Sequence, residues 1–277
     1  MATRHPGTSS LRLSRPGDHS GYFSSPAHEE VLSRLAYLVE NRRPCGLLTG
    51  PAGTGKSLLW EVFLHELRER GLQQAGLVDL RGLVAEDLPA HISACWRLGP
   101  WSDDSALQTW RAIQDHVRGL SLCRTPGVLI LDHLDRADAS CALGLDRLMK
   151  LAEYSHGHLT LLFAARSLED CCAAGLVSEL SDLRIELWPF DALETSRYVA
   201  YRLQASGFSG ASLEPAAMMA VYRRTRGLPR EINRVCDLLI LTGLVRSGGT
   251  VLAEAVEDVT AELPQVPSHQ DEEPALI

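Results

Sequence analysis

Lysine is almost absent from this sequence of 277 residues, in which only Lys56 and Lys150 carry an ammonium group. Because the basic residues number 27, the other 25 are arginines, and the 35 acidic residues leave a formal net charge of −8. A protein that coats nucleic acid needs clustered cations to contact phosphates. The acidic balance therefore argues against nucleic acid as the main partner, although it does not exclude a local basic patch.

Long apolar runs are also missing. No stretch approaches the roughly 18 apolar residues that cross a bilayer. The first residues, MATRHPGTSSLRLSRPGDHS, lack the continuous apolar stretch of a secretory signal. We therefore expect a cytoplasmic protein without a membrane segment.

Cysteine spacings that bind metal are absent as well. The seven cysteines include no CxxC pair and no histidine-containing zinc spacing. An odd number of scattered cysteines is typical of reduced, mostly buried thiols. The adjacent Cys171 and Cys172 fall in a predicted helix, and we expect them to be structural.

What is present indicates a globular protein of alternating strands and helices. The composition, 45% hydrophobic and 22% charged, is close to that of soluble globular proteins. Short apolar runs predict five strands, at 45–50, 75–80, 127–132, 159–165 and 183–187. Amphipathic segments predict helices at about 26–40, 56–71, 85–98, 105–117 and 139–153. This alternation implies a mainly parallel sheet with helices on both faces.

The alternation stops after Pro189. Asp191 and Glu194 form a variant of the capping box, and further helices are predicted at about 195–207, 212–226, 229–246 and 252–262. We therefore expect an α/β domain over residues 21–190 and a small all-helical domain over residues 191–263. Residues 1–20 and the acidic residues 264–277 are expected to be disordered tails.

Residues 50–57 read GPAGTGKS and match the pattern GxxxxGK[ST] between a predicted strand and a predicted helix. Glycines allow successive amide groups to face a polyphosphate at the positive end of a helix. Lys56 can reach the outer phosphates, and Ser57 offers its hydroxyl to Mg²⁺. The predicted cofactors are ATP and Mg²⁺, and the predicted nucleotide contacts are Gly50, Pro51, Ala52, Gly53, Thr54, Gly55, Lys56, Ser57 and Leu58.

A carboxylate follows the third predicted strand. Asp132 ends the run GVLILD, so it should emerge at the carboxyl edge of the sheet, beside the glycine-rich loop. An aspartate at the end of a strand is often only a turn former. Paired with the loop, Asp132 is predicted to be the second magnesium contact, through water.

Two further segments, together with the loop and Asp132, match the sequence pattern of a known protein family. They are SPAHEEVLSRLAYLVENRRPCGLLTG at 25–50 and GLPREINRVCDLLI at 227–240. Over residues 21–260 the chain resembles the AAA+ ATPases, specifically the ExeA/GspA-like group of the general secretion pathway. The resemblance implies a three-layer P-loop NTPase sandwich whose helical domain acts as a lid.

The resemblance also implies roles for two arginines. It places Arg230 as a sensor that contacts the nucleotide from the lid, and Arg184 as an arginine finger offered to a neighbouring subunit of a homo-oligomer. Each has a simpler alternative. Arg230 stands among other arginines of a helix surface, and Arg184 alternates with apolar residues as the solvent side of an edge-like strand does.

His133 departs from the family pattern, in which the residue after the strand-end aspartate is usually an acid that orients the attacking water. A neutral imidazole can accept a hydrogen bond, so His133 is chemically eligible. Asp135 is the other candidate for orienting the water. The third interpretation is that the protein is a nucleotide-gated switch that hydrolyses ATP slowly. Similarly, Arg166 or Ser167 stands where the family carries a polar sensor at the end of the fourth strand.

Several residues with aromatic side chains allow two interpretations. Tyr22, Phe23 and His28 lie near the base of the nucleotide in similar proteins, where an aromatic side chain could stack on adenine; the alternative is a hydrophobic anchor. Three tryptophans between the second and third predicted strands are expected to serve packing or partner contacts. They are Trp96, Trp101 and Trp110.

These observations favour an ATPase that hydrolyses Mg-ATP and uses lid and subunit motion to act on an unidentified protein partner. Two alternatives remain. One is an ATP-occupied scaffold with little hydrolysis, and the other is a DNA-associated loader or transposition-type regulator.

Overall fold

The computed structural model describes residues 22–99, 105–169 and 171–261. These residues form two compact units. The larger unit is Ser24–Trp188, and the smaller begins at Pro189 and includes Phe23 from the N-terminal side. Trp101 lies outside the described residues, as do the predicted tails at 1–20 and 264–277.

The larger unit is built on a sheet of five parallel strands, which confirms the predicted sheet. The strand order is β2-β3-β4-β1-β5. The bounds are β1 (Cys45–Thr49), β2 (Ala75–Asp79), β3 (Gly127–Asp132), β4 (Leu159–Ala164) and β5 (Leu183–Glu186). Every residue of β3 and β4 is buried, as expected for central strands covered on both faces.

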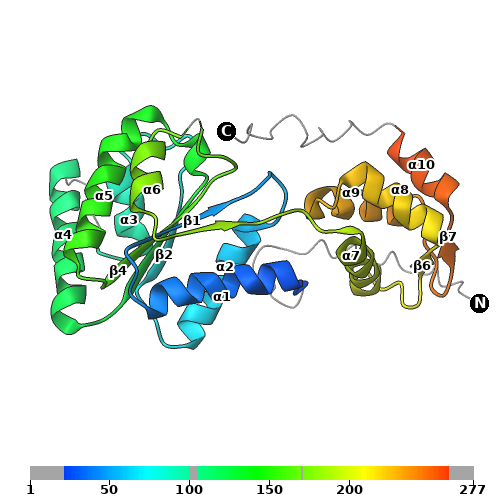
Figure 1. The fold of residues 1–277 in the computed structure, drawn as a ribbon, viewed down its shortest axis with the longest axis horizontal. Helices are drawn as coiled ribbons and strands as arrows, with labels where there is room; N and C mark the ends of the chain where they lie inside the picture. Colours follow the sequence, from blue (N-terminus) through cyan, green and yellow to red (C-terminus); the bar gives the residue numbers. More distant parts are fainter. Residues whose placement is uncertain (1–21, 100–104, 170, 262–277) are drawn as a thin grey trace, which may run out of the picture. The chain divides into compact units, whose positions relative to one another are not determined.

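Helices cover both faces of this sheet (Figure 1). They are α1 (Pro26–Glu40), α2 (Lys56–Glu69), α3 (Leu88–Cys95), α4 (Ala106–Cys123), α5 (Ala142–Tyr154) and α6 (Ala174–Leu180). The first two contact β1, β2 and β5, whereas α3, α5 and α6 contact β2, β4 and β1. Short 3₁₀ turns at Leu134–Arg136 and Ala139–Cys141 link β3 to α5.

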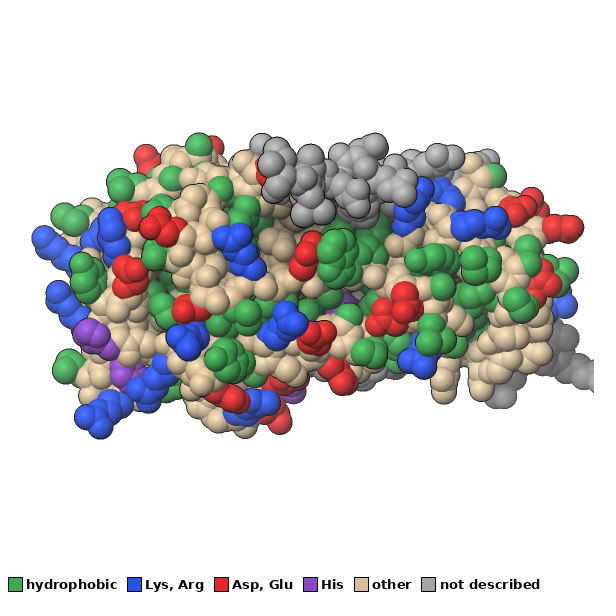
Figure 2. Space-filling view, viewed as in Figure 1, with side chains coloured by type: hydrophobic (Ala, Val, Ile, Leu, Met, Phe, Trp, Pro, Cys, Tyr) green, Lys and Arg blue, Asp and Glu red, His purple; other side chains and the backbone are tan. Residues whose placement is uncertain are grey.

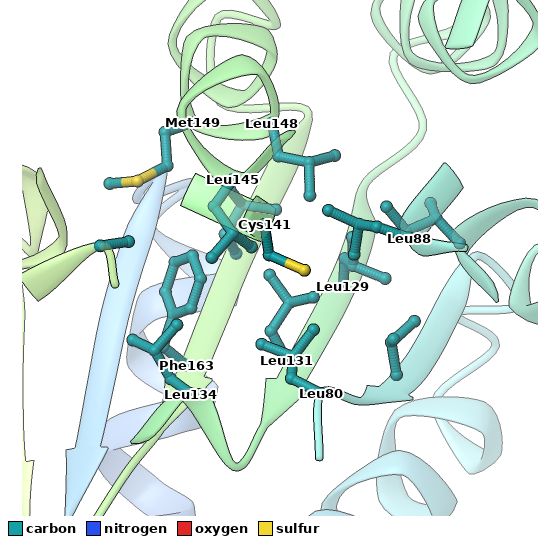
Figure 3. Close-up of a cluster of buried hydrophobic side chains, with 14 of the residues drawn as sticks. Leu80, Leu88, Leu129, Leu131, Leu134, Cys141, Leu145, Leu148, Met149 and Phe163 are labelled. Carbon is teal, nitrogen blue, oxygen red and sulfur yellow. The ribbon is translucent and has the colours of Figure 1, made fainter. Parts of the chain in front are cut away.

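The core under α3–α6 follows the two-residue period of the strands. Leu129 and Leu131 of β3 point into it, together with Leu145 of α5 and Phe163 of β4 (Figure 3). All four side chains are fully buried. The alternate β3 residues, including Ile130, are equally buried, so the aliphatic run GVLILD supplies both faces of the sheet.

Local sequence signals set several helix starts. Ser25 caps α1 by accepting a hydrogen bond from His28 N at 3.2 Å, and Pro26 takes the first helical position. The predicted capping box of Asp191 and Glu194 is confirmed at the start of α7 (Ala192–Ala205).

The smaller unit consists mainly of helices α7, α8 (Pro215–Thr225), α9 (Pro229–Leu241) and α10 (Ala253–Thr260). It also contains a short parallel ladder between β6 (Ser212–Leu213) and β7 (Thr250–Val251), which the sequence did not predict. This ladder delays the start of α8 to Pro215. The predicted end of α9 at residue 246 is wrong, because Gly243 adopts a left-handed φ of 71° and closes the helix.

Phe23 is part of an aromatic cluster in the smaller unit. Its ring centroid lies 6.0 Å from that of Phe190, 5.2 Å from that of Tyr198 and 5.4 Å from that of Tyr201. Contacts at these distances are typical of packed aromatic pairs. Of the two readings of Phe23, the structure therefore supports the hydrophobic anchor and not base stacking.

The cysteines and tryptophans have structural positions. All seven cysteines are free thiols, and Cys171 and Cys172 lie in the turn before α6, so their predicted helical placement is wrong. Trp96 and Trp110 are buried in the core of the larger unit, consistent with packing. Among the described residues, no helix is both long and apolar enough to cross a membrane.

Candidate nucleotide-binding site

The glycine-rich loop connects β1 to α2 and depends on backbone conformations that favour glycine. Gly50, Gly53 and Gly55 have φ values of 147°, 93° and 106°. A Cβ added to Gly50 would lie 2.3 Å from the carbonyl oxygen of Leu187, so no larger residue fits there. Because α2 begins at Lys56, the loop ends at the positive pole of a helix. This combination is suited to binding a phosphate chain.

Buried polar contacts support the loop from beneath. Thr54 is 1% exposed, and its hydroxyl donates to Pro51 O at 3.0 Å. His28 of α1 is 4% exposed, and its Nε2 lies 3.3 Å from Thr54 O. The structure therefore contradicts His28 as a base-stacking residue, because its ring is enclosed against the loop backbone.

Lys56 already directs its charge into the loop. Its Nζ donates to Gly50 O at 2.5 Å and to Pro51 O at 2.9 Å. Neutral carbonyl oxygens are weaker partners for an ammonium than the charged oxygens of a phosphate. The ammonium is thus positioned to exchange these contacts for contacts with an anionic ligand. Leu58, in the first turn of α2, is 43% exposed and leaves an apolar surface beside the loop.

Ser57 and Asp132 meet at the carboxyl edge of the sheet, as the sequence predicts. Ser57 Oγ donates to Asp132 Oδ2 at 2.7 Å, and Asp132 Oδ1 accepts from His133 N at 2.8 Å. The carboxylate is only 4% exposed. A hydroxyl and a carboxylate are hard oxygen ligands of the kind that Mg²⁺ prefers.

Protein side chains alone do not provide a complete metal site. Among the described residues, no group of three or more His, Cys, Asp or Glu side chains is arranged to hold a metal ion. Magnesium commonly binds through one or two protein ligands plus phosphate oxygens and water. The pair of Ser57 and Asp132 fits that mode.

His133 lies immediately after Asp132 in a strained backbone position. Its φ of 59° is uncommon for a residue other than glycine. Its Nδ1 lies 3.1 Å from Asp79 Oδ1 and 3.4 Å from Asp132 Oδ2, and the side chain is 27% exposed. The imidazole therefore lies at the edge of the sheet beside two carboxylates, with no hydrogen bond from Nδ1 to either of them.

Asp79 is a site residue that the sequence reasoning missed. It ends β2 and is the register partner of Asp132 on the neighbouring strand. Arg81 holds its carboxylate, with Nε 2.8 Å and Nη2 2.5 Å from Oδ2. Partial burial works to raise the pKa of Asp79, but hydrogen bonds from Arg81 and the charge of His133 outweigh it and lower the pKa. The sequence pattern that could have identified Asp79 is AGLVD, which, like GVLILD, is an apolar strand that ends in aspartate.

Asp135 is engaged in a different interaction. Its carboxylate, with the side chain 8% exposed, accepts from Arg166 N at 3.1 Å and from Arg166 Nε at 2.7 Å. Partial burial opposes the shift, but these hydrogen bonds and the charge of Arg166 lower the pKa of Asp135. Asp135 and Arg166, predicted separately as a water-orienting acid and a sensor, are thus partners that join the ends of β3 and β4.

The two arginines implied by the family resemblance lie on separate units. Arg184 is exposed on β5, an edge strand, and its Nη2 donates to Ser178 O at 2.7 Å and to Ser178 Oγ. Arg230 is exposed in the first turn of α9. Their predicted roles as finger and sensor remain predictions.

The fold and the loop define a P-loop protein of the AAA+ class. Residues 26–162 match the sequence model of the family described as the AAA ATPase domain. The chain therefore contains an AAA ATPase domain over these residues, which confirms the family that the sequence predicts.

The chain is also similar in sequence to an individual protein. The chain is 25% identical over 236 residues to General secretion pathway protein A of Aeromonas hydrophila, a match that covers 83% of this chain and 42% of that protein. The chain thus spans less than half the length of this relative.

Solved structures share the fold. Drosophila ORC bound to DNA matches with a TM-score of 0.63 and 16% identity, over 96% of this chain and 72% of that one. The ORC2 protein of Aeropyrum pernix, in ADPNP and ADP complexes, matches with a TM-score of 0.61 and 14% identity, over 92% and 72%.

Proposed function

We propose that this chain binds Mg-ATP in the loop between β1 and α2 and hydrolyses it to ADP and phosphate. The observation that carries the proposal is the hydrogen bond of 2.7 Å between Ser57 and Asp132, formed beside a loop that contains Lys56. The amides of residues 50–55 and the ammonium of Lys56 bind the phosphates. Ser57 and Asp132 would hold Mg²⁺, which would supply positive charge that neutralises the phosphates. The apolar surface of Leu58 adjoins the nucleotide.

His133 is the residue that we assign to orienting the attacking water. Of the two residues that compete for this role, Asp135 already accepts two hydrogen bonds from Arg166. His133 lies next to Asp132, on the same edge as the loop, and its ring is reachable from solvent. Because imidazole is a less usual choice here than a carboxylate, a slow nucleotide-gated switch is the second candidate function.

The remaining roles rest on the family resemblance. We propose that the helical domain, residues 191–263, acts as a lid whose Arg230 contacts the nucleotide bound by residues 21–190. Arg184 serves a neighbouring copy of the chain as an arginine finger, so that activity depends on assembly. We place the protein in the cytoplasm, where ATP is available, with a protein as its partner.

Nucleic acid is not assigned as a partner, although one solved neighbour is bound to DNA. Acidic and basic side chains are interspersed over the described surface shown in Figure 2. Together with the net charge of −8, this supports a protein partner over a DNA track.

The two lysines of the chain allow a matched test of ATP binding. Lys56→Ala removes the charge in the loop, whereas Lys150→Ala removes a lysine that pairs with Asp146 on the surface of α5 at 2.6 Å. Losing charge-assisted hydrogen bonds of about 1.5–3 kcal/mol should weaken ATP affinity roughly 10-fold to 150-fold in Lys56→Ala. Affinity is measured with a fluorescent ATP analogue, and turnover by phosphate release.

Lys150→Ala should retain native affinity and turnover. Equal values for the native protein and Lys56→Ala would reject the loop as the nucleotide site. Native binding without phosphate release would reject hydrolysis and support the switch.

A further inference from the structure

The larger unit has a cavity at the amino edge of its sheet, opposite the edge that carries the glycine-rich loop. The cavity lies between the C-terminal halves of α1 and α2 and the turn that leads into β3, and its volume is about 370 Å³. Its apolar lining consists of Ala36, Val39, Leu67, Leu72 and Pro126. Pockets of this size with a mainly apolar lining commonly enclose the apolar part of a ligand.

Unpaired positive charge borders this cavity. Arg42 lines it directly, and Arg124 immediately precedes the lining residue Thr125. Among the described residues, no ion pair or side-chain hydrogen bond engages the guanidinium group of Arg42 or Arg124. Glu40, an acidic residue of the lining, already accepts a hydrogen bond of 3.0 Å from Nη1 of Arg70. The cavity therefore offers two guanidinium groups to an anionic ligand.

The turns before β1, β3 and β4 bring these charges into one region. A Cβ added to Gly157 would lie 2.7 Å from Arg42 O, so the turns before β1 and β4 are in direct contact. Burial is the main cause of a lowered pKa in His158. The positive charges of Arg42, Arg124 and His156 lower it further, which requires all three to lie near this ring. Basic and histidine side chains are visible together at the lower left of Figure 2, where α1 and α4 end in Figure 1.

Exposed apolar side chains extend the same surface. Leu122 in the last turn of α4 is 85% exposed, and Tyr154 at the end of α5 is 75% exposed. The ends of these helices are joined by Ser121 Oγ, which donates to Ser155 O at 3.0 Å. Cations at the C-termini of helices stabilise them through the helix dipole, but that role gives no reason to expose a leucine and a tyrosine. Arginine and tyrosine beside apolar surface are typical of protein interfaces.

We propose that this amino edge binds an acidic segment of a protein partner, with one apolar side chain of the segment in the cavity and its carboxylates on Arg42 and Arg124. Guanidinium groups match the planar geometry of carboxylates. An apolar anchor in a pocket supplies affinity, and the charges around it select the partner. Because the surface lies at the edge opposite the loop, this binding goes beyond the ATP chemistry proposed above and does not require it.

Two fluorescein-labelled peptides test the proposal by fluorescence anisotropy with the full chain. In one peptide a leucine is flanked on each side by two glutamates, and in the other an alanine replaces the leucine. The leucine peptide should show saturable binding with a Kd below ~1 mM. The alanine peptide should bind about tenfold more weakly, because less apolar surface is buried in the cavity.

Variants of the chain locate the binding surface. Thr125→Trp fills the cavity and should weaken binding of the leucine peptide about tenfold, to the level of the alanine peptide, whereas Thr125→Ala should leave it unchanged. Arg42→Gln should weaken both peptides about fivefold, the upper range for an exposed ion pair. Arg118→Gln is the charge control, because this arginine pairs with Asp115 on α4 at 3.4 Å and should not affect binding.

Three outcomes overturn the proposal. The first is no saturable binding of the leucine peptide, or equal affinity for the two peptides. The second is native affinity in both Thr125→Trp and Arg42→Gln, which places the peptide elsewhere. The third is oligothymidylate that binds as tightly as the leucine peptide and is weakened by Arg42→Gln, which identifies a nucleic-acid surface instead.

ATP affinity and phosphate release are measured on the same samples. Both should keep their native values in Thr125→Trp and Arg42→Gln, and thermal unfolding verifies that each variant is folded. A native chain without ATP binding would reject the function proposed above, while the peptide titrations would still decide the inference about the amino edge.

Discussion

Asp135 shows how a single buried carboxylate at the edge of the site contributes to stability. Its side chain is 8% exposed and accepts two hydrogen bonds from Arg166. Burying a carboxylate is costly unless it is paired in this way. The pairing lowers the pKa of Asp135 in the folded protein.

This lowered pKa predicts a dependence of stability on pH. A carboxylate with a lower pKa in the folded state stabilises the fold above its unfolded pKa of about 3.9, and the contribution is lost as the pH falls through the folded value. Asp135→Asn should therefore lower the free energy of unfolding at pH 7 and have a smaller effect near pH 3. Urea unfolding at both pH values measures the difference.

The matched control is Asp138→Asn, which replaces a nearby exposed carboxylate that accepts from Ser140 N at 2.9 Å. Its effect at pH 7 should be smaller than that of Asp135→Asn. An equal loss in Asp135→Asn at pH 7 and pH 3 would contradict a charge-dependent role for Asp135.

The residues of the site differ in how far the sequence could predict them. Ser57 and Asp132 were predicted because a motif and a strand end are both local patterns. The contacts of Asp79 with His133, and of Asp135 with Arg166, depend on which strands are neighbours and in what register. Neither quantity can be read from a short stretch of sequence, so these pairs emerged only from the structure.

Among the elements, the loop between β1 and α2 is tightly constrained. Gly50 has a φ of 147°, and an added Cβ would lie 2.3 Å from Leu187 O, just beyond the end of β5. The backbone of the loop therefore packs directly against the segment that follows the edge strand. A side chain at residue 50 would have to displace either the loop backbone or the segment that follows β5.

Gly50→Ala should weaken ATP affinity by more than tenfold and lower the melting temperature, because clash and backbone strain add, at about 1–3 kcal/mol each. Gly71→Ala is the control, since its φ is 85° but an added Cβ meets nothing within 4 Å. It isolates the cost of the backbone conformation. Titration with a fluorescent ATP analogue and thermal unfolding compare the two variants, and equal affinities in both would contradict this view of the loop.

The strands and helices also show where periodicity is informative. Five aliphatic runs predicted five strands, because strands buried on both faces need continuous apolar residues. The ends of α8 and α9 were less predictable. They depend on the ladder between β6 and β7 and on the left-handed Gly243, which are set by tertiary pairing and by one backbone angle.

At the scale of the whole molecule, the sequence and structure agree on an AAA ATPase domain with a second, mainly helical unit. The chain spans 42% of the length of General secretion pathway protein A of Aeromonas hydrophila. Residues 26–162, which match the model of the AAA ATPase domain, include the loop and the strand-end aspartate.

Calorimetric titration of the native chain with ATP, with and without Mg²⁺, tests the central claim most directly. The account predicts one ATP bound per chain, tighter binding when Mg²⁺ is present, and loss of this magnesium effect in Asp132→Asn. A native chain that binds neither ATP nor ADP, or binds ATP with the same magnesium dependence after Asp132→Asn, would contradict it.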